Sequence, residues 1–562
     1  MAVEVFVQGR RVVLNESSDF RAKGGEGAVY VKGGTAYKMY ADPAAMFPEG
    51  KLDELAALER PTVLRPLALA RDRRGAPVGY TMRSLEGGVV LCRMFPKAFR
   101  AKHRLAPDRA LHLVRRLQDG VAYIHSRGIL LVDLNELNFL LDRDLREVYF
   151  IDVNSYQTRS YPATALMESV RDRQCGGVFT ELSDWFSFAV VSFQVFVGIH
   201  PYKGSHPRHG GPAHWMEHME RNLSVLNPAV SVPSTCLPFD AIPQAYRDWY
   251  RAVLEEGKRL PPPRAPQAVV VIAVPRDRAG SAGTLFRIEE VAEFPEEILT
   301  HCDGLTLTTG GVYSGKTKVM DAPGDACLGF TPRLRRPLIA WVESGKARVH
   351  DRGLKAPASL DLAAEALMAH GGCLYAKQGM SLLRLAPVEL ADRTLIGAMA
   401  VGNVTARSTA LFEGGALLSL LGGFHALLFP TPGECRSVRL PELDGHTLLD
   451  ARAARNVLVV AAEQGGRYQR FVFRFDPECR AYDCRTVPDA APDVNLAALD
   501  TGVCLLMGEN DELEVFSART GDPNVKALRD PALGGDARLF ARGGQALFAR
   551  GRRLYRFTMR GT

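Results

Sequence analysis

A single repeated unit fills the second half of the chain and constrains its fold more than any other feature. Each unit consists of an apolar stretch, a glycine or polar turn and a second apolar stretch, as in "PLIAWVESGKARVH". The seven units begin at residues 304, 337, 371, 414, 456, 501 and 543. Their starts are therefore 33 to 45 residues apart, close to the length of a four-stranded β-propeller blade. The repeat predicts an all-β domain, because short apolar segments bounded by turns are typical of strands.

The period favours a seven-bladed β-propeller over 284–562, while other stacked β domains stay open because no WD or kelch signature marks the units. The stretch "TLFRIEEVAEF" (284–294) is predicted to form a strand that pairs with the last unit and closes the ring. A proline-rich stretch, "EEGKRLPPPRAPQ" (255–267), separates the repeats from the preceding sequence. We therefore predict a linker at 265–283.

The sequence before the linker is organised differently. Short strand-like segments come first, and a helix is predicted at 50–59. Apolar residues then recur every three or four positions from 107 to 125, which predicts an amphipathic helix. The segment 184–197 is apolar on nearly every face, which predicts a buried helix. The predicted α+β domain is 1–264, with a β-rich lobe at 1–84 and a helical lobe at 85–264.

Composition excludes several classes of protein. The 562 residues are 46% hydrophobic and 24% charged, which predicts folded domains with sizeable cores. The net charge of +7 is spread along the chain, so no nucleic-acid partner is expected. The ten cysteines form no metal-like pairs and are expected to be reduced thiols, which favours a cytoplasmic location. No signal peptide begins the chain and no apolar run reaches the roughly 18 residues of a membrane helix, so no membrane association is expected.

Two features of the first domain carry residues suited to phosphate binding. A glycine-rich turn, "AKGGEGAVY" (22–30), offers backbone amides to a phosphate, although such a turn is more often a plain hairpin. Lys38 follows in an apolar strand, where a lysine either extends to solvent or is held for an anion. Glu54 on the predicted helix is the expected partner of Lys38, with Glu49 and Glu59 as competing candidates.

A second group of polar residues lies between apolar stretches. Asp133 and Asn138 occur in "LLVDLNELNFLLD", and Asp152 follows in "VYFIDVNSYQ". Each residue has a simple structural explanation, since Asp152 can cap a strand end, Asn138 can satisfy a turn and Asp184 can cap a helix. Carboxylate and amide oxygens are also the groups that bind Mg²⁺ and accept a hydroxyl proton in phosphoryl transfer.

The order of glycine turn, strand lysine, helix glutamate, "HSRGILLVDLNELNFLL" and "VYFIDVNSYQ" resembles that of eukaryotic-like protein kinases over 15–265. The resemblance implies a multidomain protein in which a bilobal, α+β kinase domain that uses ATP and Mg²⁺ precedes the propeller. It implies that Asp133 is the catalytic base, assisted by Lys38 and Glu54. Asn138 and Asp152 would bind metal, and Asp184 would anchor the catalytic loop. The implied nucleotide-binding residues are Gly24, Gly25, Glu26, Gly27, Val29, Ala36, Lys38, Met82, Arg83 and Leu85.

Several positions depart from the kinase pattern. Ala22 replaces the first glycine of the glycine-rich loop. Leu131 and Val132 replace the usual His-Arg pair, so no strict need for activation-loop phosphorylation is expected. Asn135 replaces a lysine that lies near the γ-phosphate in kinases, which removes a positive charge from the transition state and predicts slow turnover.

The segment after Asp152 is also unusual. Val153 and Asn154 replace the Phe-Gly of the D-F-G motif, and we expect the bend to survive because asparagine tolerates positive φ. No clear A-P-E motif follows. Glu181 is the glutamate nearest to the place where that motif would lie, and whether Glu181 pairs with Arg259 stays open.

The phrases "VDLNELN" and "IDVNSYQ", with "DWFSFA", resemble more specifically a bacterial branch of these kinases. Its members are often associated with a von Willebrand-type protein and a PP2C-type phosphatase, so the resemblance implies both as partners beside a protein substrate. The favoured function is a serine/threonine kinase whose propeller recruits substrates or partners. A pseudokinase scaffold and a transferase of AMP to protein are the alternatives.

Overall fold

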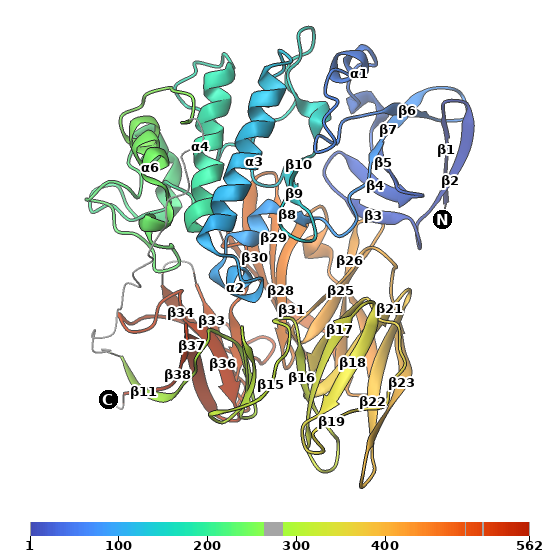
Figure 1. Cartoon of the computed structure of the whole chain (residues 1–562), viewed down its shortest axis with the longest axis vertical. Helices are drawn as coiled ribbons and strands as arrows, with labels where there is room; N and C mark the ends of the chain where they lie inside the picture. The colour runs from blue at the N-terminus through green and yellow to red at the C-terminus, as the bar shows by residue number, and fades with distance from the viewer. Residues whose placement is uncertain (1, 264–284, 489, 509–510, 561–562) are drawn as a thin grey trace. The chain divides into compact units, whose positions relative to one another are not determined.

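The computed structural model describes residues 2–263, 285–488, 490–508 and 511–560 (Figure 1). The chain is mostly β, with few helices, and divides into two compact units. The first unit holds most of the residues before 264, and the second holds those after 284 together with the short segments 16–24 and 101–104. The predicted domain boundaries stay predictions, and the linker predicted at 265–283 lies outside the described residues.

Residues 2–83 contain a seven-stranded sheet in the order β2-β1-β6-β7-β5-β4-β3. Its strands are β1 (Ala2–Val7), β2 (Arg10–Asn15), β3 (Phe20–Lys23), β4 (Gly27–Lys32), β5 (Thr35–Tyr40), β6 (Ala68–Arg71) and β7 (Pro77–Arg83). A small sheet in the order β10-β9-β8 follows. It contains β8 (Val89–Val90), β9 (Phe139–Leu141) and β10 (Val148–Phe150).

Two long helices form the centre of the helical part. The predicted amphipathic helix is confirmed as α3 (Pro107–His125), whose apolar side is buried. The predicted buried helix is α4 (Glu181–Val197), which begins three residues earlier than expected, because Thr180 and Ser183 form a capping box. The shorter helices are α1 (Gly50–Leu55), α2 (Lys97–Lys102), α5 (Trp215–Glu220) and α6 (Gln244–Tyr250). The remaining helical turns are η1 (Pro43–Ala45), η2 (Leu91–Met94), η3 (Val153–Ser155), η4 (Pro212–His214), η5 (Phe239–Ala241), η6 (Arg251–Glu255) and η7 (Pro441–Leu443).

The second unit contains seven four-stranded antiparallel sheets in its described residues. The first three are β12 (Ile298–Cys302), β13 (Leu305–Thr308), β14 (Gly311–Ser314) and β15 (Thr317–Met320); β16 (Cys327–Phe330), β17 (Pro337–Glu343), β18 (Lys346–Asp351) and β19 (Ala356–Pro357); and β20 (Ala366–His370), β21 (Cys373–Gln378), β22 (Ser381–Glu389) and β23 (Thr394–Asn403). The next three are β24 (Thr409–Phe412), β25 (Gly415–Leu420), β26 (Gly423–Thr431) and β27 (Glu434–Arg439); β28 (Thr447–Ala454), β29 (Val457–Gln464), β30 (Arg467–Phe475) and β31 (Tyr482–Pro488); and β32 (Leu496–Ala498), β33 (Val503–Met507), β34 (Glu512–Ser517) and β35 (Val525–Arg529).

The seventh sheet joins the two ends of the second unit. It contains β36 (Arg538–Arg542), β37 (Gln545–Arg550), β38 (Arg553–Met559) and, from far earlier in the chain, β11 (Phe286–Glu293). The strand β11 pairs with β38 in antiparallel register, from Phe286 opposite Met559 to Glu293 opposite Arg553. The predicted pairing of the stretch at 284–294 with the last unit is therefore confirmed.

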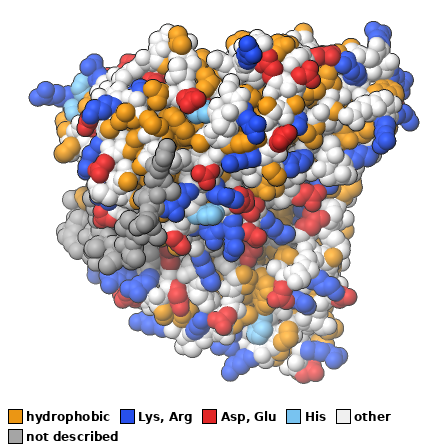
Figure 2. Space-filling view, turned by 45° about the horizontal axis from the view of Figure 1, so that its top comes forward, with side chains coloured by type: hydrophobic (Ala, Val, Ile, Leu, Met, Phe, Trp, Pro, Cys, Tyr) orange, Lys and Arg blue, Asp and Glu red, His pale blue; other side chains and the backbone are white. Residues whose placement is uncertain are grey.

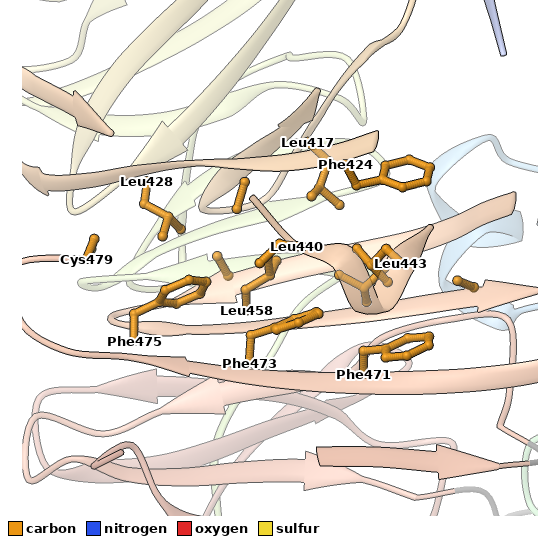
Figure 3. Packing of buried hydrophobic residues seen from close by; sticks show 14 residues of the cluster. Leu417, Phe424, Leu428, Leu440, Leu443, Leu458, Phe471, Phe473, Phe475 and Cys479 are labelled. Atoms are coloured by element: carbon orange, nitrogen blue, oxygen red, sulfur yellow. The ribbon is translucent and has the colours of Figure 1, made fainter. Parts of the chain in front are cut away.

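Neighbouring sheets of the second unit bury apolar residues between their faces. Between the fourth and fifth sheets, Phe424 and Leu428 of β26 pack with Leu458, Phe471 and Phe473 of β29 and β30 (Figure 3). Alternate residues of β29 turn to the sheet on the other side, where Val457 and Val459 pack against β33 and β34. Since successive side chains of a strand point to opposite faces, β29 is apolar at nearly every position.

Charged side chains do not segregate on the face drawn in Figure 2, where basic and acidic groups are interspersed. In the part of the chain that the structure describes, no helix has both the length and the apolar character needed to span a bilayer.

Candidate active site

Lys38 is a buried lysine between two partly exposed carboxylates of the first unit. It sits on β5, opposite Val29 of β4 and Tyr80 of β7. Its Nζ is 2.6 Å from Asp152 Oδ1 and 2.6 Å from Glu26 Oε2. Burial by itself lowers the pKa of Lys38, but the carboxylates of Asp152 and Glu26 reverse this effect and raise the pKa well above its usual value. Lys38 is therefore a cation held between two carboxylates.

The predicted pairing of Lys38 with Glu54 is wrong for this structure. Among the described residues Lys38 forms ion pairs with Glu26 and Asp152, while Glu54 accepts a hydrogen bond from Ser160 N at 3.2 Å. The predicted helix at 50–59 ends at Leu55, and its buried side carries Lys51 and Leu55. Glu54 therefore faces the segment after Asp152 rather than β5.

The competing glutamates are also engaged elsewhere or exposed. Glu49 forms an ion pair with Arg71 at 2.8 Å, and Glu59 is exposed. Lys51 is almost fully buried, and its burial lowers its pKa to about 8. The sequence did not predict that Lys51 is buried. The spacing of apolar residues cannot show which side of a six-residue helix a lysine will occupy.

Asp133 is buried and held by three donors. Its Oδ1 accepts a hydrogen bond from Met167 N at 2.7 Å, and its Oδ2 accepts one from Asn138 Nδ2 at 3.2 Å. Burial raises the pKa of Asp133, while hydrogen bonds from Asn135, Met167 and Asn138 oppose that rise. The net result is a carboxylate that binds a proton more readily than a free aspartate, which suits a base in proton transfer.

Asp184 fixes the backbone that carries Asp133. Its side chain is fully buried, and its two oxygens accept hydrogen bonds from Leu131 N and Val132 N, each at 2.8 Å. His125 Nε2 lies 2.9 Å from Asp184 Oδ2. Val132 has φ of 63°, which is costly for a β-branched residue. Asp184 therefore compensates a strained backbone, and the helix-cap alternative for it is wrong because Thr180 caps α4.

Asp152 begins a tight turn next to the Asp133 loop. Ile151 N donates to Asn138 O at 3.0 Å, which places the two metal-ligand candidates on neighbouring backbone. The positive φ expected at Asn154 falls on Asp152 instead, with φ 57° and ψ 28°. Asn154 lies in the turn η3, and its side chain is buried and bonded to Tyr80 and Tyr40. Asn154 therefore does not supply the positive φ that we expected of it. It contributes side-chain hydrogen bonds instead.

The glycine-rich turn lies between β3 and β4. At Gly24 and Gly25 an added Cβ would meet no atom within 4 Å, so the backbone there borders open space. Gly27 is different, because a Cβ would lie 2.0 Å from Met39 O of β5. Close approach of the two strands therefore requires Gly27.

The predicted nucleotide-binding residues Ala36, Met82, Arg83 and Leu85 lie on β5 and around the end of β7. Ala36 and Met82 are directly paired between β5 and β7, and the Arg83 side chain donates to Pro61 O at 2.7 Å. An added Cβ on Gly88 would lie 2.9 Å from Leu85 and 3.5 Å from Leu140. Leu140 of β9 thus lies beside Leu85, and no motif in the sequence pointed to it.

Arg259 pairs with Asp172 rather than with Glu181, the pairing that the sequence left open. Its Nη2 is 2.6 Å from Asp172 Oδ1 and its Nε is 2.7 Å from Asp172 Oδ2, an arrangement typical of strong arginine–carboxylate pairs. Its guanidinium also lies over the ring of Phe186 at 4.4 Å. Asp172 belongs to an irregular segment without motif or periodicity, so the sequence offered no signal for it.

The chain is similar to a protein named protein kinase YegI from Escherichia coli strain K12. The two are 28% identical over 204 residues, which cover 32% of this chain and 31% of the relative. Protein kinase YegI of Escherichia coli O157:H7 matches to the same extent. The chain therefore spans about a third of the length of the curated relatives it matches. No family model matches the chain. The similarity supports a kinase-like relation.

Proposed function

We propose that the chain is an ATP- and Mg²⁺-dependent protein serine/threonine kinase. One observation carries the proposal: Lys38 Nζ on β5 lies 2.6 Å from Asp152 Oδ1, although the two residues are 114 positions apart. This contact joins a strand lysine to a carboxylate whose backbone neighbours the Asp133 loop. A cation beside a carboxylate and a second, proton-accepting carboxylate is the arrangement that phosphoryl transfer from a nucleotide requires. The similarity to a protein named as a kinase supports the same activity.

The residues present fit a magnesium ion that is shared with a nucleotide. No group of three or more His, Cys, Asp and Glu suited to a metal occurs among the described residues. Mg²⁺ in nucleotide sites needs less, since one or two protein oxygens suffice when phosphates and water complete its shell. Asn138 uses its Nδ2 toward Asp133, which leaves its amide oxygen available. Asp152 has one oxygen on Lys38 and a second one available, and its side chain is 40% exposed.

Each residue would then have a defined task. Lys38 would hold phosphate oxygens, while Asn138 and Asp152 would hold the metal that neutralises phosphate charge. Asp133 would accept the proton of a serine or threonine hydroxyl as that oxygen bonds to the γ-phosphorus and ADP leaves. Its Oδ2 has the weaker existing contact, at 3.2 Å, and is the oxygen we assign to the proton.

Glu26 is expected to lower the affinity for ATP. It lies in the glycine-rich turn and forms an ion pair with Lys38, the residue proposed to bind the phosphates. We expect Glu26→Gln to bind ATP about two- to fivefold more tightly, since incoming phosphates no longer compete with a partly exposed carboxylate. Calorimetric titration of the full chain with ATP measures this. Glu59→Gln is the matched control, because Glu59 is exposed and forms no ion pair with the described residues. Equal or weaker binding by Glu26→Gln would show that Glu26 does not compete with the nucleotide.

A pseudokinase scaffold is the second candidate. It is favoured by Asn135, which stands where kinases have a lysine and which accepts a hydrogen bond from Leu137 N at 2.8 Å. An amide in that position adds no positive charge to the site, so transfer would be slow or absent while nucleotide binding persists.

Labelled nucleotides separate these functions. The full chain is incubated with Mg²⁺ and either γ-labelled or α-labelled ATP, with and without a general protein acceptor, beside Asp152→Asn. Entry of γ-label into protein, lost in Asp152→Asn, is the expected result. A melting temperature raised by nucleotide without any γ-label transfer would replace the kinase with the pseudokinase scaffold. Entry of α-label would show AMP transfer instead.

We further propose that the second unit is a seven-bladed β-propeller that recruits substrates or partners. The first strands of successive sheets touch one another in order, from β16 through β20, β24, β28 and β32 to β36, and β36 touches β12. Together with the pairing of β11 and β38, these contacts describe a nearly complete ring of sheets. A PP2C-type phosphatase, a von Willebrand-type protein and a protein substrate are the proposed partners. None of the ten cysteines, all of which lie in the described residues, forms a disulfide, and this fits the proposed cytoplasmic location.

A further inference from the structure

The turn after Asp152 is tied to the sheet by two tyrosine hydroxyls. Tyr80 OH donates to Asn154 Oδ1 at 2.6 Å, and Asn154 Nδ2 donates to Tyr40 OH at 3.2 Å. The exposed fractions are 1% for Tyr80, 8% for Tyr40 and 2% for Asn154. Both polar ends of one amide are therefore satisfied by side chains from two neighbouring strands, far from solvent.

Both tyrosines share a face of the sheet with Lys38. Tyr40 follows Lys38 by two residues on β5, and Tyr80 lies directly opposite Lys38 on β7. The Lys38 ammonium is 5.8 Å from the centre of the Tyr40 ring. The strand pattern thus places the cation and the two hydroxyls together, because residues two apart on a strand point the same way.

The tyrosine rings are themselves held in place. Tyr40 and Tyr80 belong to a buried cluster with Phe47, whose ring centre is 5.5 Å from that of Tyr80. Burial raises the pKa of Tyr40 to about 12 and raises that of Tyr80 further, so both hydroxyls stay protonated at neutral pH. Their hydrogen-bonding atoms therefore have fixed positions and a fixed protonation state.

Two independent links therefore hold the turn at Asp152. One is the ion pair between Asp152 and Lys38, and the other is the pair of hydrogen bonds from the Asn154 amide to the two tyrosines. The first link is temporary in the proposed reaction, because the phosphates of a bound nucleotide compete with Asp152 for Lys38. The second link contains no charge and does not involve Lys38. Within the turn, Ser155 N donates to Asp152 O at 2.9 Å, so a fixed Asn154 also fixes the backbone of Asp152.

We propose that Tyr40, Tyr80 and Asn154 form a positioning clamp that keeps Asp152 aimed at the metal when the nucleotide draws Lys38 away. This inference rests on the proposed kinase function and adds three residues to it. None of the three touches the nucleotide or metal; they act through Asp152. A glycine at position 154 would permit the turn but offer no group for the tyrosines to hold.

The test measures how much Mg²⁺ is needed for nucleotide binding, and not the rate of phosphotransfer. In the full chain, Tyr80→Phe removes one hydroxyl and keeps the ring. We expect the Mg²⁺ concentration that half-saturates the nucleotide-dependent rise in melting temperature to increase about five- to tenfold, as for loss of a buried hydrogen bond. ATP binding in EDTA should equal that of the wild type, since Lys38 is unchanged. Asn154→Ala removes both tyrosine contacts and should give at least this shift, and adding Tyr80→Phe to Asn154→Ala should change nothing further.

Tyr202→Phe is the matched control, because Tyr202 is equally buried and its hydroxyl donates to Leu254 O at 3.0 Å outside the site. It should lower the melting temperature but leave the Mg²⁺ requirement unchanged. If Tyr80→Phe proves too unstable, Tyr40→Phe tests the longer contact. A wild-type Mg²⁺ requirement in Tyr80→Phe or, where that variant does not fold, in Tyr40→Phe would overturn the clamp alone. Absence of Mg²⁺-dependent nucleotide binding in the wild type would overturn the kinase proposal and the clamp together.

Discussion

Replacing Asp133 by asparagine is expected to lower phosphotransfer by about 10²- to 10⁴-fold, the range that a general base contributes. The substitution preserves the shape of the side chain and the acceptor for Met167 N, which lies 2.7 Å from Asp133 Oδ1. It removes the oxygen that we assign to the hydroxyl proton. Nucleotide binding should persist, because Lys38 is paired with Glu26 and Asp152 and not with Asp133. Initial rates of γ-label transfer and calorimetric ATP titration give the two quantities.

Asp142→Asn is the control for that experiment. Asp142 precedes β10 and its carboxylate accepts a hydrogen bond from Glu147 N at 3.0 Å, a contact that an asparagine oxygen can keep. The control should transfer phosphate at the wild-type rate. If Asp133→Asn also stays within about threefold of the wild type, where a general base contributes far more, Asp133 is not the base. Loss of ATP binding in Asp133→Asn would show instead that Asp133 supports the nucleotide site itself.

The repeat in the sequence marks the second and third strands of each sheet. The unit that begins at 456, for example, contains β29 and β30. These strands are buried by a neighbour on both faces, so they read as continuous apolar runs between turns. The first and last strands of each sheet carry less signal, since β19 has two residues and β32 has three. Periodicity therefore indicated how many sheets there are but not where each one begins.

Helix prediction succeeded where one side of a helix meets the core. The spacing from 107 to 125 matches α3 residue by residue, because a long amphipathic pattern has few other solutions. The prediction at 50–59 was too long, and the role of Glu54 failed with it. A six-residue helix makes less than two full turns, so its orientation is decided by tertiary contacts such as that of Lys51 with Pro162 O at 3.5 Å.

The site residues that sequence reasoning found are those whose side-chain chemistry is unusual for their surroundings. Lys38 and Asp152 are charged residues next to apolar stretches, and the structure brings them into contact. Met167 was missed because it acts through a backbone amide, which nearly every residue has. Tyr40 and Tyr80 were missed because tyrosines in strands are ordinary core residues, and only their long-range contacts with Asn154 distinguish them.

The Asp184→Asn variant is expected to be less stable than the wild type, with the loss located in the loop that carries Asp133. An asparagine keeps one acceptor oxygen but turns an amide group toward one of Leu131 N, Val132 N and His125 Nε2, which now surround the carboxylate at 2.8 to 2.9 Å. Each buried donor left without a partner costs roughly 1–3 kcal/mol. The free energy of unfolding of the first unit should therefore fall by about 1–3 kcal/mol for each of these donors that loses its partner, seen as a lower denaturation midpoint.

Amide hydrogen exchange locates the effect, because the donors are backbone groups. In Asp184→Asn, amide exchange at Leu131 and Val132 should accelerate well beyond any change within α4, since the strained backbone at Val132, with φ of 63°, loses the hydrogen bonds that hold it. Asp108→Asn is the control, because Asp108 also lies in the first turn of a helix but is exposed, and within the described part of the chain its carboxylate accepts only from Arg109 N. If Asp184→Asn unfolds at the wild-type midpoint with both amides still protected, then the loop around Asp133 is held by its own hydrogen bonds, and Asp184 is a buried charge without a structural task.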